Sequence, residues 1–156
     1  MLIRKANEKD TDELILLRLR YLSEHFGDIS NTKQQIVQQL EGYIKVHLSR
    51  DFIAFLAEQD GQIVACAYLV VQEKPANPRF PSGKTGLLLN VYTHEAYRRQ
   101  GAASRLLSAV IEEARLLGLS FIELTSTQAG EPLYRKFGFV NKDNCHEMML
   151  VIKNDK

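Results

Sequence analysis

Residues 98–104 combine basic side chains with the start of a predicted helix, and this combination suits a phosphate group. The segment reads Arg98-Arg99-Gln100-Gly101-Ala102-Ala103-Ser104. The first turn of a helix leaves backbone N–H groups unpaired and carries partial positive charge, so it attracts anions. Gly101 and the small alanines let an anion approach that backbone closely, and the arginines add charge-assisted donors. The segment therefore predicts a site for a phosphate or pyrophosphate.

Two familiar phosphate motifs do not describe this segment. It lacks the Gly-Lys-Ser or Gly-Lys-Thr of a P-loop, and it lacks the further glycines and the βαβ start of a dinucleotide fingerprint. A purely structural explanation stays open beside the functional one. In that explanation the small residues only pack a helix against a neighbouring strand, and Arg98 and Arg99 lie in a solvated turn.

The elements that must position this segment follow from hydrophobic periodicity and turn signals. A strand at Leu2–Ala6 is followed by helices at about Thr11–His25 and Thr32–Ser49. Asp10, with Glu13 three residues later, is predicted to cap the first helix. Both helices carry apolar residues at a helical period, so each is expected to bury one face.

The middle of the chain changes to the pattern of a β-hairpin. Phe52–Ala57 and Ile63–Val71 are predicted to pair as antiparallel strands, because the Asp60-Gly61 pair between them suits a tight turn. Lys74–Gly86 is rich in proline and glycine and is predicted to be an irregular loop.

The remaining elements alternate between strands and helices. They are a strand at Leu87–Thr93, a helix at Gly101–Leu117, a strand at Phe121–Thr125, a helix at Pro132–Phe137, and strands near Phe139 and at Glu147–Ile152. The whole order predicts an α/β fold with helices flanking one sheet. We expect a single domain over residues 1–156.

Composition excludes several classes of protein. Twenty Lys and Arg residues against nineteen Asp and Glu give a net charge of +1, which predicts no binding to nucleic acid or to an anionic membrane. The two cysteines and the scattered histidines have no metal-ligand spacing, so no metal is expected. No apolar run approaches the length of a spanning helix, and the charged N-terminus does not read as a secretory signal. We expect a cytoplasmic protein, either a monomer or a homodimer.

Two blocks of the sequence resemble the GNAT superfamily of N-acetyltransferases. Arg98, Gly101 and Ala103 fill the places of the acetyl-CoA signature of that family, which is Arg or Gln, two residues, Gly, one residue, then Gly or Ala. Val91-Tyr92-Thr93 before it resembles the usual approach to this signature. Residues 124–139 are similar to the later strand and helix of the family, which typically end in Leu-Tyr-x-x-x-Gly-Phe. The element order also fits, so the resemblance spans nearly the whole chain.

This resemblance implies a mixed, mostly antiparallel sheet and a site for acetyl-CoA as the cosubstrate. The backbone of Arg98–Ser104 would bind the pyrophosphate, and Val91–Thr93 would pair with the pantetheine arm. A backbone N–H near Val91 would polarise the thioester carbonyl. Tyr134 matches the general acid of the family, which protonates the departing thiolate. For Tyr134 the structural alternative is an aromatic residue that only packs the last helix.

The general base is not assigned by the resemblance. Many relatives carry an acid on the strand before the signature, whereas Leu87-Leu88-Leu89-Asn90 offers none here. Asn90 cannot act as a base but can hold a water. Glu123, Glu24 and His25 are candidates. Thr127 replaces an Asn that is frequent in the family.

The predicted activity is transfer of the acetyl group to a primary amine by direct attack in a ternary complex. A small-molecule amine is the first choice, because the catalytic domain uses up the chain, and acids such as Glu24 and Asp28 would attract a cationic amine. Acetylation of protein N-termini or lysines is the alternative within the enzyme class. A module that binds acyl-CoA without turnover is the alternative outside it.

Overall fold

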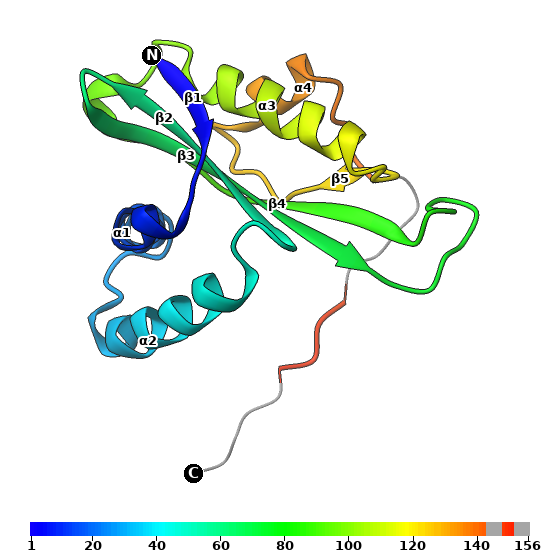
Figure 1. Ribbon diagram of the computed structural model, residues 1–156, viewed down its shortest axis with the longest axis horizontal. Helices are drawn as coiled ribbons and strands as arrows, with labels where there is room; N and C mark the ends of the chain where they lie inside the picture. The colour runs from blue at the N-terminus through cyan, green and yellow to red at the C-terminus, as the bar shows by residue number, and fades with distance from the viewer. Residues whose placement is uncertain (143–147, 152–156) are drawn as a thin grey trace. The chain divides into compact units, whose positions relative to one another are not determined.

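The computed structural model describes residues 1–142 and 148–151 and forms two compact units, Met1–Thr125 and Ser126–Lys156 (Figure 1). The larger unit contains one sheet with strand order β1-β2-β3-β4-β5. The strands are β1 (Leu2–Lys5), β2 (Phe52–Gln59), β3 (Gln62–Glu73), β4 (Lys84–Thr93) and β5 (Ile122–Glu123). The first four are antiparallel and β5 runs parallel to β4. The predicted mixed, mostly antiparallel sheet is confirmed.

Helices cover both faces of this sheet, and Figure 1 shows α1 (Thr11–Phe26) and α2 (Ser30–His47) on the face opposite α3 (Ala102–Leu116). The helices α1 and α3 bury their apolar faces, whereas α2 buries only Ile44 and keeps the rest of its apolar stripe half-buried. Leu14 and Leu17 of α1 pack into one core cluster with Leu56 and Tyr68 of the sheet. The helix α3 buries its own apolar stripe, made of Ala102, Leu106, Leu107, Val110 and Ala114.

The hairpin between β2 and β3 forms where the sequence predicts it. Asp60 and Gly61 have φ angles of 52° and 75°, so both central residues of the turn adopt the left-handed conformation. That is the requirement of a type I′ turn, whose twist matches the twist of paired strands. The Asp-Gly pair therefore fixes the register between β2 and β3.

Asp10 occupies the N-cap position of α1, as predicted, but its side chain makes no capping hydrogen bond to that helix. Asn7 caps the preceding 3₁₀ turn, Glu8–Asp10, where its side chain accepts a hydrogen bond from the Lys9 N–H. The Asp10 carboxylate instead accepts hydrogen bonds from the Asn7 N–H and from Arg4, all at 2.8 Å. The arginine lies on β1, so a carboxylate predicted to serve its own helix links that helix to the sheet.

The smaller unit contains α4 (Glu131–Lys136), with Pro132 in its first turn and Gly138, at a φ of 88°, just beyond its end. The predicted helix here is confirmed. The strand predicted near Phe139 is wrong, since residues 139–142 contain no strand. For the last predicted strand, the structure describes only residues 148–151, which form no strand, whereas Glu147 and Ile152 lie outside the described residues. The apolar side chains of residues 148–151 are exposed, and these residues pair with no strand among the described residues.

Replacing Asp10 by Asn tests the link between α1 and β1. Because the Arg4 guanidinium holds the pKa of Asp10 below its usual range, the ionised carboxylate stabilises the fold. We expect Asp10→Asn to lower the free energy of unfolding at pH 7 by about 1–3 kcal/mol. The difference is complete above the unfolded pKa of about 3.9 and disappears as the pH falls through the lower folded value. Urea unfolding between pH 7 and pH 2 measures it.

Asp60→Asn is the matched control, because Asp60 lies in an exposed turn and accepts no hydrogen bond from another described side chain. Its effect is expected to be small over the same pH range. A difference between wild type and Asp10→Asn that stays constant with pH would contradict the charge-based role of Asp10.

Candidate functional site: an anion cradle and an adjoining pocket

The turn before α3 presents successive backbone N–H groups to one place. Arg99 and Gly101 adopt φ angles of 61° and 85°. Alternation of left-handed and ordinary residues curves the chain so that its N–H groups converge, which is the geometry of an anion nest. The helical hydrogen bonds of α3 begin when the Arg105 N–H donates to the Gly101 carbonyl, at 3.1 Å. The N–H groups of residues 102–104 therefore have no partner within the helix.

The small residues of this turn serve packing as well as approach. Ala102 is 2% exposed and lies in the interface between α3 and the sheet, whereas Gly101 is exposed. A Cβ built at Gly101 would meet nothing within 4 Å. Packing of α3 against the sheet therefore explains the small side chain of Ala102. It does not explain Gly101, where a Cβ would have space and the left-handed backbone conformation is what favours glycine.

The side chain of Arg98 is engaged with the end of α1. Its guanidinium donates to both carboxylate oxygens of Glu24, at 2.8 and 2.7 Å, and to the Thr93 carbonyl, at 3.0 Å. The Glu24 carboxylate raises the pKa of Arg98 above its usual value. The Arg98 guanidinium is therefore occupied by Glu24 and Thr93, and the predicted contribution of Arg98 to an anion site falls to its main chain.

The other predicted side chains of the turn are exposed or half-buried. Arg99 is exposed and makes no ion pair with another described residue, and Gln100 donates to the Ala96 carbonyl at 3.2 Å. Arg105, further along α3, donates to the Met1 carbonyl. Arg99 is thus the basic side chain of the turn whose charge is uncommitted within the described part of the chain.

The strand β4 leads into this turn with one edge largely open. On the β3 side it is paired from Lys84 to Thr93 except at Asn90 and Val91. On the β5 side it is paired only at Gly86 and Leu87. Residues 88–93, which include the predicted Val91, Tyr92 and Thr93, have no strand partner on that edge within the described residues. An extended ligand with amide groups can add to such an edge by main-chain hydrogen bonds.

A bulge interrupts β4 in the middle of this open stretch. Cys66 pairs with Tyr92 and Tyr68 pairs with Leu89, so the residue between them on β3 opposes two residues of β4, Asn90 and Val91. Asn90 has a φ of 51° and is 3% exposed. A bulge of this kind turns main-chain groups away from the neighbouring ladder.

The Asn90 side chain is fixed on both sides. Its oxygen accepts from Arg18 of α1 at 3.2 Å, and its amide donates to the Cys66 sulfur at 3.3 Å. Sequence reasoning offered Asn90 as a holder of water and missed Arg18. Burial raises the pKa of the Cys66 thiol to about 12, so this cysteine is a packed, unreactive group.

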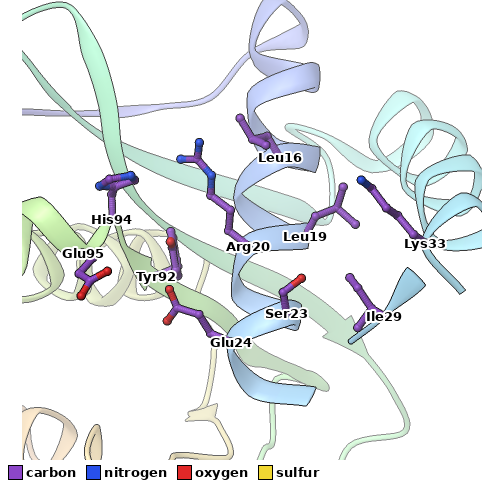
Figure 2. Close-up of a pocket in the computed structure, with 10 residues that line it drawn as sticks. All are labelled: Leu16, Leu19, Arg20, Ser23, Glu24, Ile29, Lys33, Tyr92, His94 and Glu95. Atoms are coloured by element: carbon purple, nitrogen blue, oxygen red, sulfur yellow. The ribbon is translucent and has the colours of Figure 1, made fainter. Parts of the chain in front are cut away.

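A pocket of about 510 Å³ lies between α1, α2 and the end of β4 (Figure 2). It is lined by Leu16, Leu19, Arg20, Ser23, Glu24, Ile29, Lys33, Tyr92, His94 and Glu95. Its size falls within the range of small-molecule sites. Tyr92, which lines it, is also one of the residues predicted to approach the cosubstrate.

Of the residues considered as bases, the structure brings only Glu24 to this pocket. His25 stacks on Tyr21 instead, and Glu123 is half-buried on β5. Asp28, predicted to attract an amine, does not line the pocket. Its carboxylate accepts from the Ser30 N–H at the start of α2, and this bond lowers the pKa of Asp28.

Sequence reasoning missed four charged or titratable residues of the pocket: Arg20, Lys33, His94 and Glu95. The sequence contained a signal for one of them: Arg20 interrupts an apolar run of α1, and a charged side chain in such a run indicates a candidate functional residue. The His94 Nδ1 atom is buried and has no hydrogen-bond partner among the described residues.

Tyr134, the predicted general acid, lies half-buried on α4 in the smaller unit. Its ring meets the edge of Phe139 at a centroid distance of 5.8 Å. The Thr127 hydroxyl accepts from the Gly130 N–H at 3.2 Å and so shapes the turn that leads into α4. The threonine that departs from the family pattern therefore has a local structural role.

The described residues contain neither a metal cluster nor a membrane-spanning helix. No group of three or more His, Cys, Asp or Glu residues in residues 1–142 and 148–151 has a metal-binding arrangement. Within the same ranges no helix combines the length and the apolar character needed to cross a bilayer.

Comparison with known proteins identifies a family and several solved structures that this chain resembles. A family model described as the acetyltransferase (GNAT) family matches residues 17–139. No curated protein matches the sequence. Among solved structures, a predicted acetyltransferase from Clostridium acetobutylicum, determined with acetyl-CoA, is 25% identical with a TM-score of 0.81, and the match covers 95% of both chains.

Two further structures share the fold. A GCN5-related N-acetyltransferase from Ralstonia eutropha is 22% identical with a TM-score of 0.81, covering 95% of this chain and 97% of its own. An aminoglycoside antibiotic 6′-N-acetyltransferase from Acinetobacter haemolyticus is 18% identical with a TM-score of 0.71, covering 98% of this chain and all of its own. Because the family model extends from α1 through the cradle to the end of α4, the chain belongs to the GNAT acetyltransferase family.

Proposed function

We propose that residues 1–156 act as one acetyl-CoA-dependent N-acetyltransferase domain that acetylates a primary amine of a small molecule. The observation that carries this proposal is that the open edge of β4 is followed, after one 3₁₀ turn at Glu95–Tyr97, by the unpaired N–H groups of the turn at Gly101. An extended amide-bearing arm that ends in a pyrophosphate matches this order of groups. The similar structure from Clostridium acetobutylicum, which contains acetyl-CoA, supports the choice of cosubstrate.

Each part of the site has one task in this proposal. The N–H groups of residues 99–104 bind the pyrophosphate, because an anion gains most where unpaired donors and the helix dipole coincide. The edge of β4 from Leu88 to Thr93 pairs with the amides of the pantetheine arm. The bulge at Asn90 and Val91 supplies a main-chain donor to the thioester oxygen, and Arg18 holds that bulge in place.

The acceptor amine occupies the pocket and attacks the thioester carbon. Glu95 and His94 line the pocket and are groups that can accept the proton the amine must lose. Glu24 is less suited, because both its oxygens already accept from Arg98. As the carbon–sulfur bond breaks, Tyr134 gives its proton to the leaving thiolate. A pocket of about 510 Å³ favours a small acceptor over a protein.

Two glycines that flank α3 give a matched test of the cradle. Gly101 precedes the helix and Gly118 follows it, with φ angles of 85° and 65°, and a Cβ at either would meet nothing within 4 Å. We expect Gly101→Ala and Gly118→Ala each to lower the free energy of unfolding by about 1–2 kcal/mol, the cost of a left-handed alanine. Only Gly101→Ala is expected to weaken the affinity for CoA, by about tenfold or more.

Calorimetric titration with CoA measures the affinity, and urea unfolding measures the shared strain. Wild-type CoA affinity in both variants would place the pyrophosphate elsewhere. Equal losses of affinity relative to wild type would mean that strain in α3, and not the cradle, is responsible.

Replacing Tyr134 by Phe tests the general acid. Removal of the proton donor is expected to lower kcat for thiol release by about 100-fold or more and to leave CoA affinity unchanged. Tyr43→Phe is the control: that tyrosine lies on α2, packs on His47 and Phe52, and does not line the pocket. A Tyr134→Phe enzyme with wild-type kcat would remove Tyr134 from the mechanism. Wild-type protein that binds acetyl-CoA but releases no thiol with any amine would instead indicate a binding module.

A further inference from the structure

Two cations line the pocket without an ion-pair partner among the described residues. Arg20, half-buried on α1, and Lys33, exposed on α2, both line it. Neither makes a hydrogen bond or an ion pair with another side chain in residues 1–142 and 148–151. An arginine that is partly withdrawn from water without a partner loses hydration, and an anionic ligand restores the balance.

The two carboxylates of the pocket are not equivalent. Glu24 forms two hydrogen bonds with Arg98, so its charge is already compensated. Glu95 is exposed and forms no ion pair with a described residue. Two uncompensated cations against one uncompensated carboxylate leave the pocket with a net positive charge.

The charged groups of the pocket lie on two sides of α1. Figure 2 shows Arg20 extending from α1 toward Tyr92 and His94 on the β4 side, whereas Lys33 and Ile29 lie on the α2 side. The proton-accepting groups lie beside β4, along which the thioester is proposed to bind. The Arg20 guanidinium extends to that same side, so an amine and a nearby carboxylate of one acceptor face Glu95, His94 and Arg20 together.

We propose that the acceptor is an amine that also carries a carboxylate, as an amino acid does. This inference rests on the proposed acetyltransferase function and names its substrate class. The amine faces Glu95 and His94, and the carboxylate is bound by Arg20, whose planar guanidinium matches two carboxylate oxygens, with Lys33 adding charge. A polycationic acceptor is disfavoured, because it would bring further positive charge beside Arg20 and Lys33.

Matched acceptor pairs that differ only by the carboxylate test this proposal. Leucine is compared with isopentylamine and phenylalanine with phenethylamine, and thiol release from acetyl-CoA is measured. The amino acid of each pair is expected to have a kcat/KM at least tenfold higher. In Arg20→Gln and in Lys33→Gln this ratio is expected to fall, in Arg20→Gln to within about threefold of unity, mainly through a rise in KM for the amino acid.

Lys45→Gln is the control, because Lys45 is an exposed lysine of α2 outside the pocket. Its ratio is expected to equal that of wild type. Wild-type protein that prefers the plain amines, or does not distinguish the pairs, would overturn the carboxylate assignment and leave the acetyltransferase function intact.

A binding measurement separates this proposal from the failure of turnover. Leucine and phenylalanine are titrated calorimetrically into wild type and Arg20→Gln in the presence of CoA. Binding to wild type that weakens about tenfold in Arg20→Gln supports the carboxylate site even if no thiol is released, in which case only the acetyltransferase function fails. Absent binding, or equal binding to both proteins, overturns the proposal whatever the activity.

Discussion

The site depends on the unequal pairing of β4. One edge of this strand is paired with β3 except at the bulge of Asn90 and Val91, whereas the other meets β5 at two residue pairs and has no further strand partner among the described residues. A strand with a free edge presents unsatisfied main-chain groups, which natural sheets normally cover. Here the chain passes from that edge through one 3₁₀ turn, Glu95–Tyr97, to the turn at Gly101, so two groups of main-chain donors lie close together along the chain. The helices on both faces hold the strand in place without closing the edge.

Much of the fold can be predicted from the sequence because its signals are local. The apolar period of α1 and α3 depends on which residues lie on one helix face, and the Asp60-Gly61 turn depends on two adjacent φ angles. The same is true of the cradle, since Gly101 and the residues around it are contiguous. The conformation of such segments depends mainly on their own residues, and for that reason a short stretch of sequence is enough to predict it.

The failures concern residues whose partners are distant in the sequence. Asp10 has the right type and spacing for a helix cap, but Arg4 on β1 competes successfully for its carboxylate. The bulge at Asn90 depends on how many residues of β3 face it, which periodicity within β4 cannot indicate. The charge of the pocket depends on residues of two helices and a strand end, which are distant in the sequence. From the sequence, Glu24 and Asp28 were therefore equally expected to attract a cationic amine. In the structure Glu24 is paired with Arg98, and Asp28 accepts a hydrogen bond at the start of α2.

The origin of the pocket residues has a consequence for how such an enzyme can be altered. Half of the ten lining residues belong to α1, and Ile29 and Lys33 lie at the start of α2, whereas the cradle is built by the end of β4 and the start of α3. Substitutions in the N-terminal helices can therefore change the lining of the pocket, the proposed acceptor site, and leave the turn at Gly101, the proposed cosubstrate site, unchanged. Glu24 is the exception, since its bidentate pairing with Arg98 joins the two regions. A combinatorial library of pocket positions would sample Leu16, Leu19, Arg20 and Lys33 freely but treat Glu24 and Arg98 as one covarying unit.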